Sequence, residues 1–256
     1  FMKPSAVTTV FFSATGNTRR GCRWLAECFE EPVEMDLTRF DMVPSRTEFG
    51  AGELVVLGAP VYGGRIYRGA AQRFRALRGD GTPCLLVVTY GNRAFDNALL
   101  ELWDLAVEQG FRPVGAAALV AEHTYGDIQK GRPDEGDREK LSTFGRQAAE
   151  KLSREDFAPL SLPGERPYGE GGDGGRFHPL LDEQSCTRCG LCARGCPEGA
   201  IDTGSLLVDG EKCISCFRCI RSCPTGARNM QDPDYLAFAE AFTQRLAKRL
   251  EPEFFL

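Results

Sequence analysis

Apolar residues in the first 157 positions fall into two recurring patterns. Short runs rich in β-branched residues have the length of buried strands, and the segments between them carry apolar residues at helical spacing. The predicted strands are Ser5–Phe12, Pro32–Leu37, Glu53–Ala59, Cys84–Thr89 and Val114–Ala121. The predicted helices are Thr18–Phe29, Ala70–Leu77, Ala94–Gln109 and Asp134–Leu152. Buried strands that alternate with helices predict an α/β fold, in which helices cover both faces of a parallel sheet.

The pattern changes after residue 157. Residues 158–180 combine prolines with a glycine cluster, which is typical of a linker. Within this stretch, Gly169–Gly174 has the GxGxxG spacing of dinucleotide sites, but no predicted strand precedes it and no predicted helix follows, so we reject that interpretation. We set Phe1, which precedes Met2, aside as a cloning remnant. The predicted segments are a first domain (2–157), a linker (158–180), a cysteine-rich domain (181–230) and a C-terminal helix and tail (231–256).

An amphipathic segment, Asp232–Leu250, follows the cysteine-rich domain. Its apolar stripe at helical spacing consists of Tyr235, Phe238, Phe242 and Leu246. We expect a closing helix packed on one of the domains, and a partner-binding helix is the alternative.

Composition and charge narrow the functional classes. The chain has 256 residues and a net charge of −5, so no basic excess suggests nucleic-acid binding. No apolar run approaches the roughly 18–20 residues of a membrane helix. The first ten residues lack the pattern of a secretion signal, so we expect a cytoplasmic protein. In a reducing compartment, eleven cysteines favour metal ligation over disulfides.

The strongest signal is a repeated cysteine motif. Cys-x2-Cys-x2-Cys-x3-Cys-Pro occurs first at residues 186–197 and again 27 residues later, at residues 213–224. Such a triplet can wrap one face of a 4Fe–4S cubane, while the fourth thiolate reaches the other cluster. We therefore assign cluster one to Cys186, Cys189, Cys192 and Cys223, and cluster two to Cys213, Cys216, Cys219 and Cys196. Zinc is the alternative, but zinc sites favour longer gaps between cysteine pairs.

The remaining cysteines, Cys22, Cys28 and Cys84, lie inside predicted helix and strand. We interpret each as a small buried hydrophobe, and a redox-active thiol is the alternative.

A second candidate site follows the first strand. The loop Ser13-Ala14-Thr15-Gly16-Asn17-Thr18 runs directly into a helix, where backbone N–H groups and the helix dipole favour an anion. The absence of a Gly-Lys-Ser/Thr ending argues against an NTP-hydrolysing loop. An ordinary capped helix start is the alternative.

This loop resembles the FMN phosphate loop of the flavodoxins. That resemblance implies a five-stranded parallel sheet of order 2-1-3-4-5, with the flavin beyond the carboxyl ends of the strands. Two further loops should then meet the flavin, with glycines for close approach and aromatic rings that can stack on it. Their candidate residues are Pro60, Val61, Tyr62, Gly63, Gly64, Tyr90, Gly91, Asn92, Arg93, Phe95 and Asp96. The alternatives are a loop system that has lost FMN or one that binds another phosphorylated ligand.

The cysteine-rich domain resembles the bacterial two-cluster ferredoxins, which implies a small α+β fold. Ala200 and Ala227 match the small residue that usually follows each Cys-Pro in that family. Arg228 departs, because the equivalent residue of the first repeat is the apolar Ile201. Nearly the whole chain resembles flavodoxin-like proteins fused to such a ferredoxin, so two 4Fe–4S clusters and FMN are the expected cofactors.

Three residues near the expected flavin rim have uncertain roles. His123 could donate a proton to reduced flavin or a substrate, or could serve a structural hydrogen bond. Arg65 and Arg93 could bind an anionic flavin or an acidic substrate, or could be solvated.

The combined cofactors favour electron transfer. Without a recognisable NAD(P)H domain, electrons should be exchanged with redox partner proteins, as in a low-potential carrier or adaptor. The alternative is an FMN-dependent reductase of a small molecule, which its own ferredoxin domain feeds. A third possibility is a non-redox role of the clusters in stability or oxygen sensing.

Overall fold

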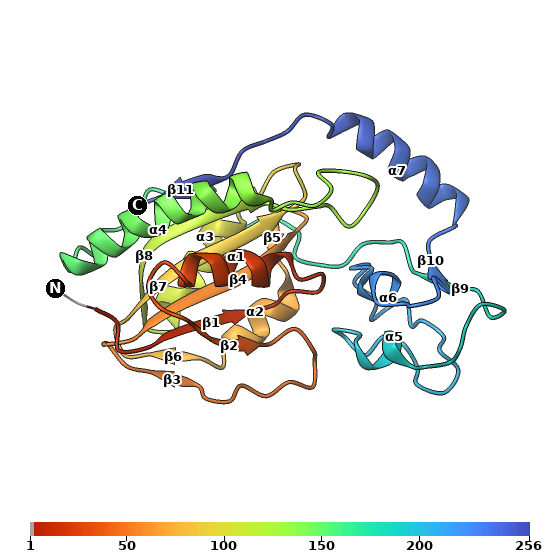
Figure 1. The fold of residues 1–256 in the computed structure, drawn as a ribbon, viewed down its shortest axis with the longest axis horizontal. Coiled ribbons are helices and arrows are strands. Elements are labelled where there is room, and N and C mark those ends of the chain that lie inside the picture. The colour runs from red at the N-terminus through yellow and green to blue at the C-terminus, as the bar shows by residue number, and fades with distance from the viewer. Residues whose placement is uncertain (1–2) are drawn as a thin grey trace.

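The structure, a computed structural model, describes residues 3–256, so the interpretation of Phe1 lies outside the described residues. Its larger part is an α/β domain built on a parallel sheet (Figure 1). The parallel strands are β1 (Val7–Phe11), β2 (Val33–Asp36), β4 (Leu54–Tyr62), β7 (Thr82–Tyr90) and β8 (Phe111–Val120). They lie side by side as β2-β1-β4-β7-β8, which confirms the predicted order 2-1-3-4-5.

Helices cover both faces of this sheet, as predicted. The helices of the domain are α1 (Asn17–Ala26) and α4 (Glu135–Ser153) on one face, and α2 (Arg68–Phe74) and α3 (Ala98–Glu108) on the other. Each face has its own buried cluster, with Leu25 and Phe144 in the first and Phe74 and Leu102 in the second. Both clusters consist of apolar side chains, so hydrophobic burial stabilises the sheet from both sides.

Short edge strands extend the sheet beyond the prediction. β11 (Glu253–Phe255), at the end of the chain, pairs antiparallel with β8. There Phe254 stacks on Phe144, with ring centroids 5.0 Å apart. β5 (Arg65–Ile66) pairs with β4, while β3 (Glu48–Phe49) and β6 (Arg78–Gly79) form a separate two-stranded sheet. Elements of two or three residues are too short to show an apolar period.

The cysteine-rich segment forms a small α+β unit beside one end of the sheet (Figure 1). Its elements are β9 (Leu180–Leu181), α5 (Leu191–Arg194), α6 (Arg218–Arg221) and β10 (Arg228–Asn229). β9 pairs antiparallel with β10, which joins the two ends of the unit. The short helices α5 and α6 each carry the third cysteine of one motif, Cys192 and Cys219, so the fold repeats as the sequence does.

Residues 158–180 lie along the α/β domain instead of spanning a gap. The Gly172 N–H donates to the Tyr62 carbonyl, and the Gly172 carbonyl accepts from the Arg68 N–H, both at 2.8 Å. Gly171, at φ 141°, approaches the Gly63 backbone so closely that a Cβ would collide with it. The glycine cluster therefore serves close backbone contact rather than free flexibility.

The C-terminal helix is shorter than predicted and contacts both domains instead of one. α7 (Pro233–Arg245) begins at Asp232, whose side chain accepts from the Tyr235 N–H at 2.9 Å. Tyr235 packs against Tyr125 of the α/β domain and Phe217 of the small unit. Residues 246–252 then run back without helix or strand to reach β11, and we name them the C-terminal strap.

Candidate functional site

The turn between β1 and α1 presents free backbone donors. Gly16 is the N-cap residue, has φ 89°, and supplies no side-chain cap. Within residues 3–256, no acceptor is recorded for the backbone N–H groups of residues 14–18. Ser13 and Thr18 support the turn from behind: the Ser13 hydroxyl accepts from the Arg19 N–H at 3.1 Å, and the hydroxyls of Thr18 and Thr89 lie 2.7 Å apart. The turn can therefore bind an anion through its backbone.

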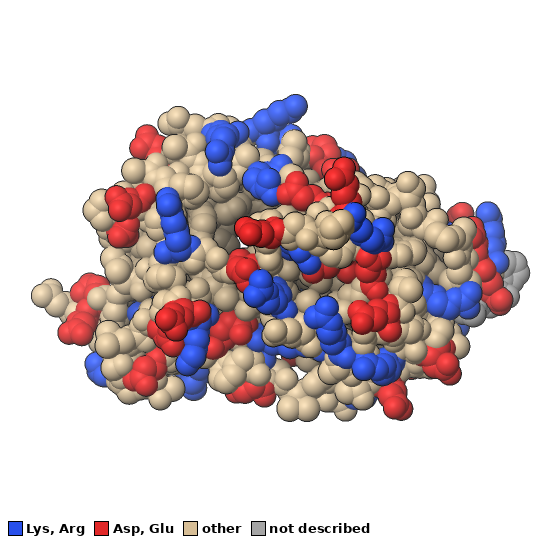
Figure 2. Space-filling model, turned by 180° about the vertical axis from the view of Figure 1, so that it is seen from behind, with Lys and Arg blue, Asp and Glu red and all other residues tan. Residues whose placement is uncertain are grey.

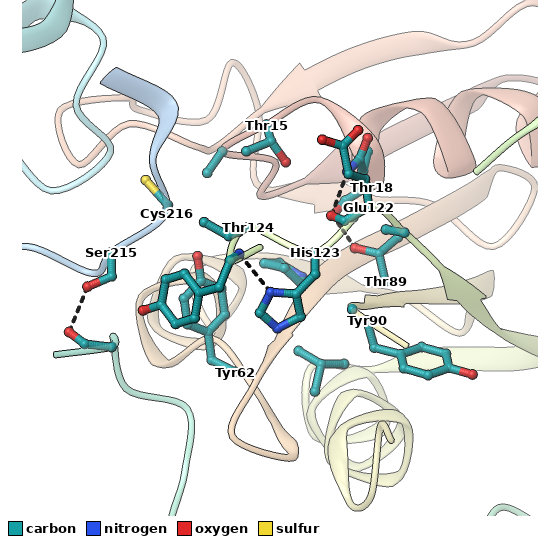
Figure 3. Close-up of a pocket in the computed structure, with 18 of the residues that line it drawn as sticks. Thr15, Thr18, Tyr62, Thr89, Tyr90, Glu122, His123, Thr124, Ser215 and Cys216 are labelled. Atoms are coloured by element: carbon teal, nitrogen blue, oxygen red, sulfur yellow. Dashed lines mark hydrogen bonds between the residues drawn. The ribbon is translucent and has the colours of Figure 1, made fainter. Parts of the chain in front are cut away.

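This turn opens into a cavity of about 330 Å³ (Figure 3). The cavity brings together the loops after β1, β4 and β7, as predicted. The candidate FMN residues that line it are Ala14, Thr15, Asn17, Thr18, Pro60, Val61, Tyr62, Gly63, Tyr90 and Gly91. A smaller cavity of about 210 Å³ shares several of these residues and adds Gly64, Arg93, Phe238 and Phe242. The two cavities together extend from the turn between β1 and α1 to helix α7.

Other predicted residues do not line either cavity. Ser13 and Gly16 shape the turn, Phe95 is buried against Tyr90, and Asp96 pairs with Arg93. Asn92 is 2% exposed and holds the C-terminal strap: its amide donates to the Leu246 and Lys248 carbonyls and accepts from the Leu250 N–H. Asn92 has a positive φ of 61°, and its side chain is directed to residues 246–250 and not to the cavity. Its role is to fix the loop that carries Tyr90.

Arg65 also lies outside both cavities. Its guanidinium forms a bidentate pair with Glu101, at 2.7 and 2.8 Å, and lies over the Tyr168 ring. Arg65 therefore connects β5, α3 and residues 158–180, and its guanidinium is occupied by these structural contacts.

His123 lines both cavities as a half-buried imidazole. Its Nδ1 accepts from the Tyr125 N–H at 2.8 Å, so the ring proton of the neutral form is on Nε2. Desolvation lowers the pKa of His123 to about 4. The absence of a side chain at Gly91 makes room for the imidazole, because a Cβ there would collide with it. At neutral pH, His123 can donate a hydrogen bond from Nε2 but holds no extra proton.

The depressed pKa of His123 predicts a loss of stability in acid. The unfolded chain binds the proton near pH 6.5 and the folded chain only near pH 4, so stability should fall as the pH drops through this window and be unaffected above it. We expect His123→Gln to reduce this acid sensitivity, measured as denaturant midpoints between pH 4 and 7. An NMR titration of the wild-type imidazole near pH 6.5 would contradict the interpretation.

Several cavity residues were not predicted. They are the neighbours of the predicted His123 in the loop after β8 (Ala121, Glu122, Thr124 and Tyr125), residues 173–175, and Ser215 and Cys216 of the small unit. Figure 3 shows Cys216 and Ser215 on one side of the cavity, facing Tyr62 and Thr15. Only the position of Cys216 inside a cluster motif marked it in the sequence, and nothing there placed it near a flavin loop.

Arginines of the small unit hold it against this cavity. The Arg218 guanidinium donates to the Ala14 and Ser13 carbonyls at 3.1 and 3.4 Å. Arg221 pairs with Glu122 at 2.9 Å. These contacts therefore involve two of the loops that line the cavity. Arg218 contacts the turn between β1 and α1, and Arg221 contacts the loop after β8.

The structure gathers the cysteines predicted for cluster one around one small cavity. Cys186, Cys189, Cys192 and Cys223 all line a space of about 20 Å³. Cys223 belongs to the second motif, so the chain does bring the fourth cysteine of one motif to the triplet of the other. Cys189 is exposed, which places this end of the small unit at the surface.

The thiols predicted for cluster two are more deeply placed. Desolvation, with a smaller contribution from the neighbouring Cys196 and Cys213 thiols, raises the pKa of Cys216 and of Cys219 to about 12. Iron binding would have to displace these protons. Within the described residues, no group of three or more His, Cys, Asp or Glu side chains is placed to hold a single metal ion.

The three cysteines outside the motifs lie in the α/β domain. Cys22 and Cys84 are buried, Cys28 is partly buried, and all eleven cysteines of residues 3–256 are free. Acidic and basic side chains are interspersed over the face seen in Figure 2. Among residues 3–256, no helix has both the length and the apolar character that a membrane span requires.

Comparisons with known proteins bear on both parts of the chain. Residues 178–224 match the family model described as a 4Fe-4S dicluster domain. No curated protein matches the chain.

Among solved structures, oxidised flavodoxin 2 from Bacillus cereus is 19% identical, with a TM-score of 0.43 over 57% of this chain and 99% of that one. A flavodoxin from the domain Archaea is 13% identical, with a TM-score of 0.41 over 58% of this chain and 99% of that one. Rubredoxin oxygen:oxidoreductase from the anaerobe Desulfovibrio gigas is 18% identical, with a TM-score of 0.42 over 60% of this chain but only 37% of that one. These TM-scores are below 0.5, so the fold assignment rests on the strand order. The chain thus joins a flavodoxin-like α/β domain to a C-terminal segment that matches the 4Fe-4S dicluster domain family.

Proposed function

We propose that the protein transfers electrons between two 4Fe–4S clusters and FMN, as a carrier or adaptor between redox partner proteins. The observation that carries this proposal is the position of Cys216. It is a predicted ligand of cluster two, and it lines the cavity that the predicted FMN loops form. FMN exchanges one or two electrons and each cluster exchanges one, so the pair links single-electron with two-electron chemistry.

The residues of the main cavity fit FMN. Its volume lies in the range of small-molecule sites, about 300–1,000 Å³. The free amides of residues 14–18 suit a phosphate, and Tyr62 offers a ring against which a planar group can stack. Residues 173–175 and Ser215 close one side, which limits the access of water.

The same closure favours electron transfer over the reductase alternative, which needs an open pocket above the flavin. The smaller cavity favours the reductase alternative, because it could hold a small molecule beside the main cavity. It has a volume of about 210 Å³, and Arg93, Phe238 and the Nε2–H of His123 surround it. We further propose a reducing, cytoplasmic setting, which suits eleven free cysteines.

The test is anaerobic purification followed by iron, sulfide and flavin counts and a redox titration. We expect about eight irons, eight sulfides and one FMN per chain. Rapid mixing with a reduced ferredoxin-type donor should then bleach the iron–sulfur and flavin absorbance. Zinc in place of iron, missing sulfide, or flavin absorbance that stays unchanged while the clusters are reduced would contradict the proposal.

Arg218→Ala should weaken FMN binding. The substitution removes a charged donor from the Ser13 and Ala14 carbonyls, and hydrogen bonds to charged groups contribute about 1.5–3 kcal/mol. We expect the FMN dissociation constant, measured by fluorescence quenching, to rise at least about tenfold. Arg75→Ala, which removes an exposed arginine at the end of α2, is the control and should leave the constant unchanged. Equal constants in both variants would exclude this role of Arg218.

A further inference from the structure

Arg228 is a buried arginine at the centre of the small unit. It opens β10 opposite Leu181 of β9 and is 2% exposed. Its backbone N–H donates at 3.4 Å to Sγ of Cys223, the cysteine of the second motif that lies with the triplet of the first. The equivalent residue of the first repeat, Ile201, is also buried but apolar. The two halves therefore differ by one full positive charge in the core.

The charge of Arg228 has no carboxylate partner. The ion pairs of residues 3–256 do not include it, and acidic side chains of the small unit pair elsewhere, as Asp209 does with Lys212 and Glu198 with Arg73. Its guanidinium donates to the Leu206 carbonyl, while its Nε is buried without any partner in the described part of the chain. An arginine stays protonated in proteins, and burying an uncompensated charge is strongly unfavourable. The surroundings of Arg228 therefore suit an anion.

Both predicted cysteine quartets adjoin this charge. Arg228 lines the cavity of about 20 Å³ that Cys186, Cys189, Cys192 and Cys223 surround. It also lies near the other quartet, because its guanidinium donates to the carbonyl of Leu206, which packs in one buried cluster with Cys196 and Cys219. Its position is thus between the places where the two clusters would be held.

We propose that Arg228 is the buried counter-charge of the two clusters, and that it raises their reduction potentials. A 4Fe–4S cluster with four thiolates is anionic and becomes more negative on reduction, so a fixed neighbouring cation stabilises the reduced form. The unpartnered Nε–H is available to a cluster or cysteine sulfur, and hydrogen bonds to sulfur also raise such potentials. The inference rests on the proposed cluster content and names the residue that tunes it.

The test is an anaerobic redox titration, followed by electron paramagnetic resonance, of the intact protein and three variants. Arg228→Met removes the charge but keeps a long side chain, and Arg228→Lys keeps the charge. The control, Arg188→Met, removes an exposed arginine beside Cys186. We expect Arg228→Met to shift the oxidised-to-reduced ratio at a fixed potential at least about tenfold, a fall of about 59 mV for a one-electron couple. Arg228→Lys and the control should shift it much less.

Iron and sulfide counts on the same samples separate the possible failures. Wild-type protein without eight irons would overturn the proposed cofactors and this inference with them. Arg228→Met that holds eight irons but keeps wild-type potentials would overturn the inference alone. If Arg228→Met does not retain its clusters, Arg228→Lys decides: near-wild-type potentials support the role of the charge, and a tenfold shift overturns it.

Discussion

Replacing Cys223 with alanine is expected to remove the cluster held by the first motif, although Cys223 belongs to the second. Cys223 lines the same small cavity as Cys186, Cys189 and Cys192, so its loss leaves three thiols where a cubane needs four. Roughly half of the iron and sulfide should be lost. Cys189→Ala should remove the same cluster, giving the same electron paramagnetic resonance spectrum of the remaining one.

Two further variants make this result specific. Cys196→Ala should remove the other cluster, because its thiol lies with Cys213, Cys216 and Cys219. Cys28→Ala, in the α/β domain, should keep all the iron. Should Cys223→Ala instead leave the same spectrum as Cys216→Ala, each motif would supply its own four ligands, and the crossed arrangement would be wrong.

Local patterns predicted the parts of this molecule that depend on neighbouring residues. A parallel sheet followed from five buried apolar runs separated by helices, and its strand order followed from the resemblance to the flavodoxins. β1 ends before its predicted loop, whereas β4 and β7 continue into theirs, to Tyr62 and Tyr90. The carboxyl ends of the strands of a parallel sheet meet at one edge, so the sequence pattern predicts where the main cavity lies. The triplet of each cysteine motif is equally local, because its spacing is written into the sequence, whereas the meeting of Cys223 with the other motif's triplet depends on the packing of the small unit.

Contacts between distant segments could not be predicted in this way. Asn92 was expected to face the flavin because of its loop, whereas it binds a strap more than 150 residues further along the chain. Cys216 and residues 173–175 reach the cavity only because the small unit docks there. Arg228 was noticed as a departure from the repeat, but its burial without a partner depends on the packing of the whole unit.

The C-terminal strap connects these long-range contacts. It carries α7, which packs between the domains, into β11 at the edge of the sheet. Along its path it is held by Asn92 from the loop after β7 and by Arg132 from the loop after β8, whose guanidinium donates to the Leu250 carbonyl at 2.6 Å. Because both loops also carry cavity residues, the strap fixes the site from behind.

Asp137→Asn is therefore expected to destabilise both the α/β domain and this attachment. Arg132 and Asp137 form an ion pair whose side chains are 2% and 1% exposed, and Asp137 also accepts from the Asp134 N–H at the start of α4. Removing one charge leaves the other buried without compensation, which costs about 3–5 kcal/mol. Whole domains are stable by only about 5–15 kcal/mol, so the loss should be large in urea unfolding.

The matched control for this variant is Asp127→Asn. Its ion pair with Lys130 is solvent-exposed, and such pairs contribute about 0–1 kcal/mol. We expect Asp127→Asn to unfold at nearly the wild-type urea midpoint. In Asp137→Asn, Arg132 no longer has a fixed orientation toward the strap, so the hydrogen exchange of the Leu250 amide should also be faster. If Asp137→Asn lowered the free energy of unfolding by less than about 1 kcal/mol, Arg132 would have to reach solvent or another partner. The strap would then be held mainly by Asn92.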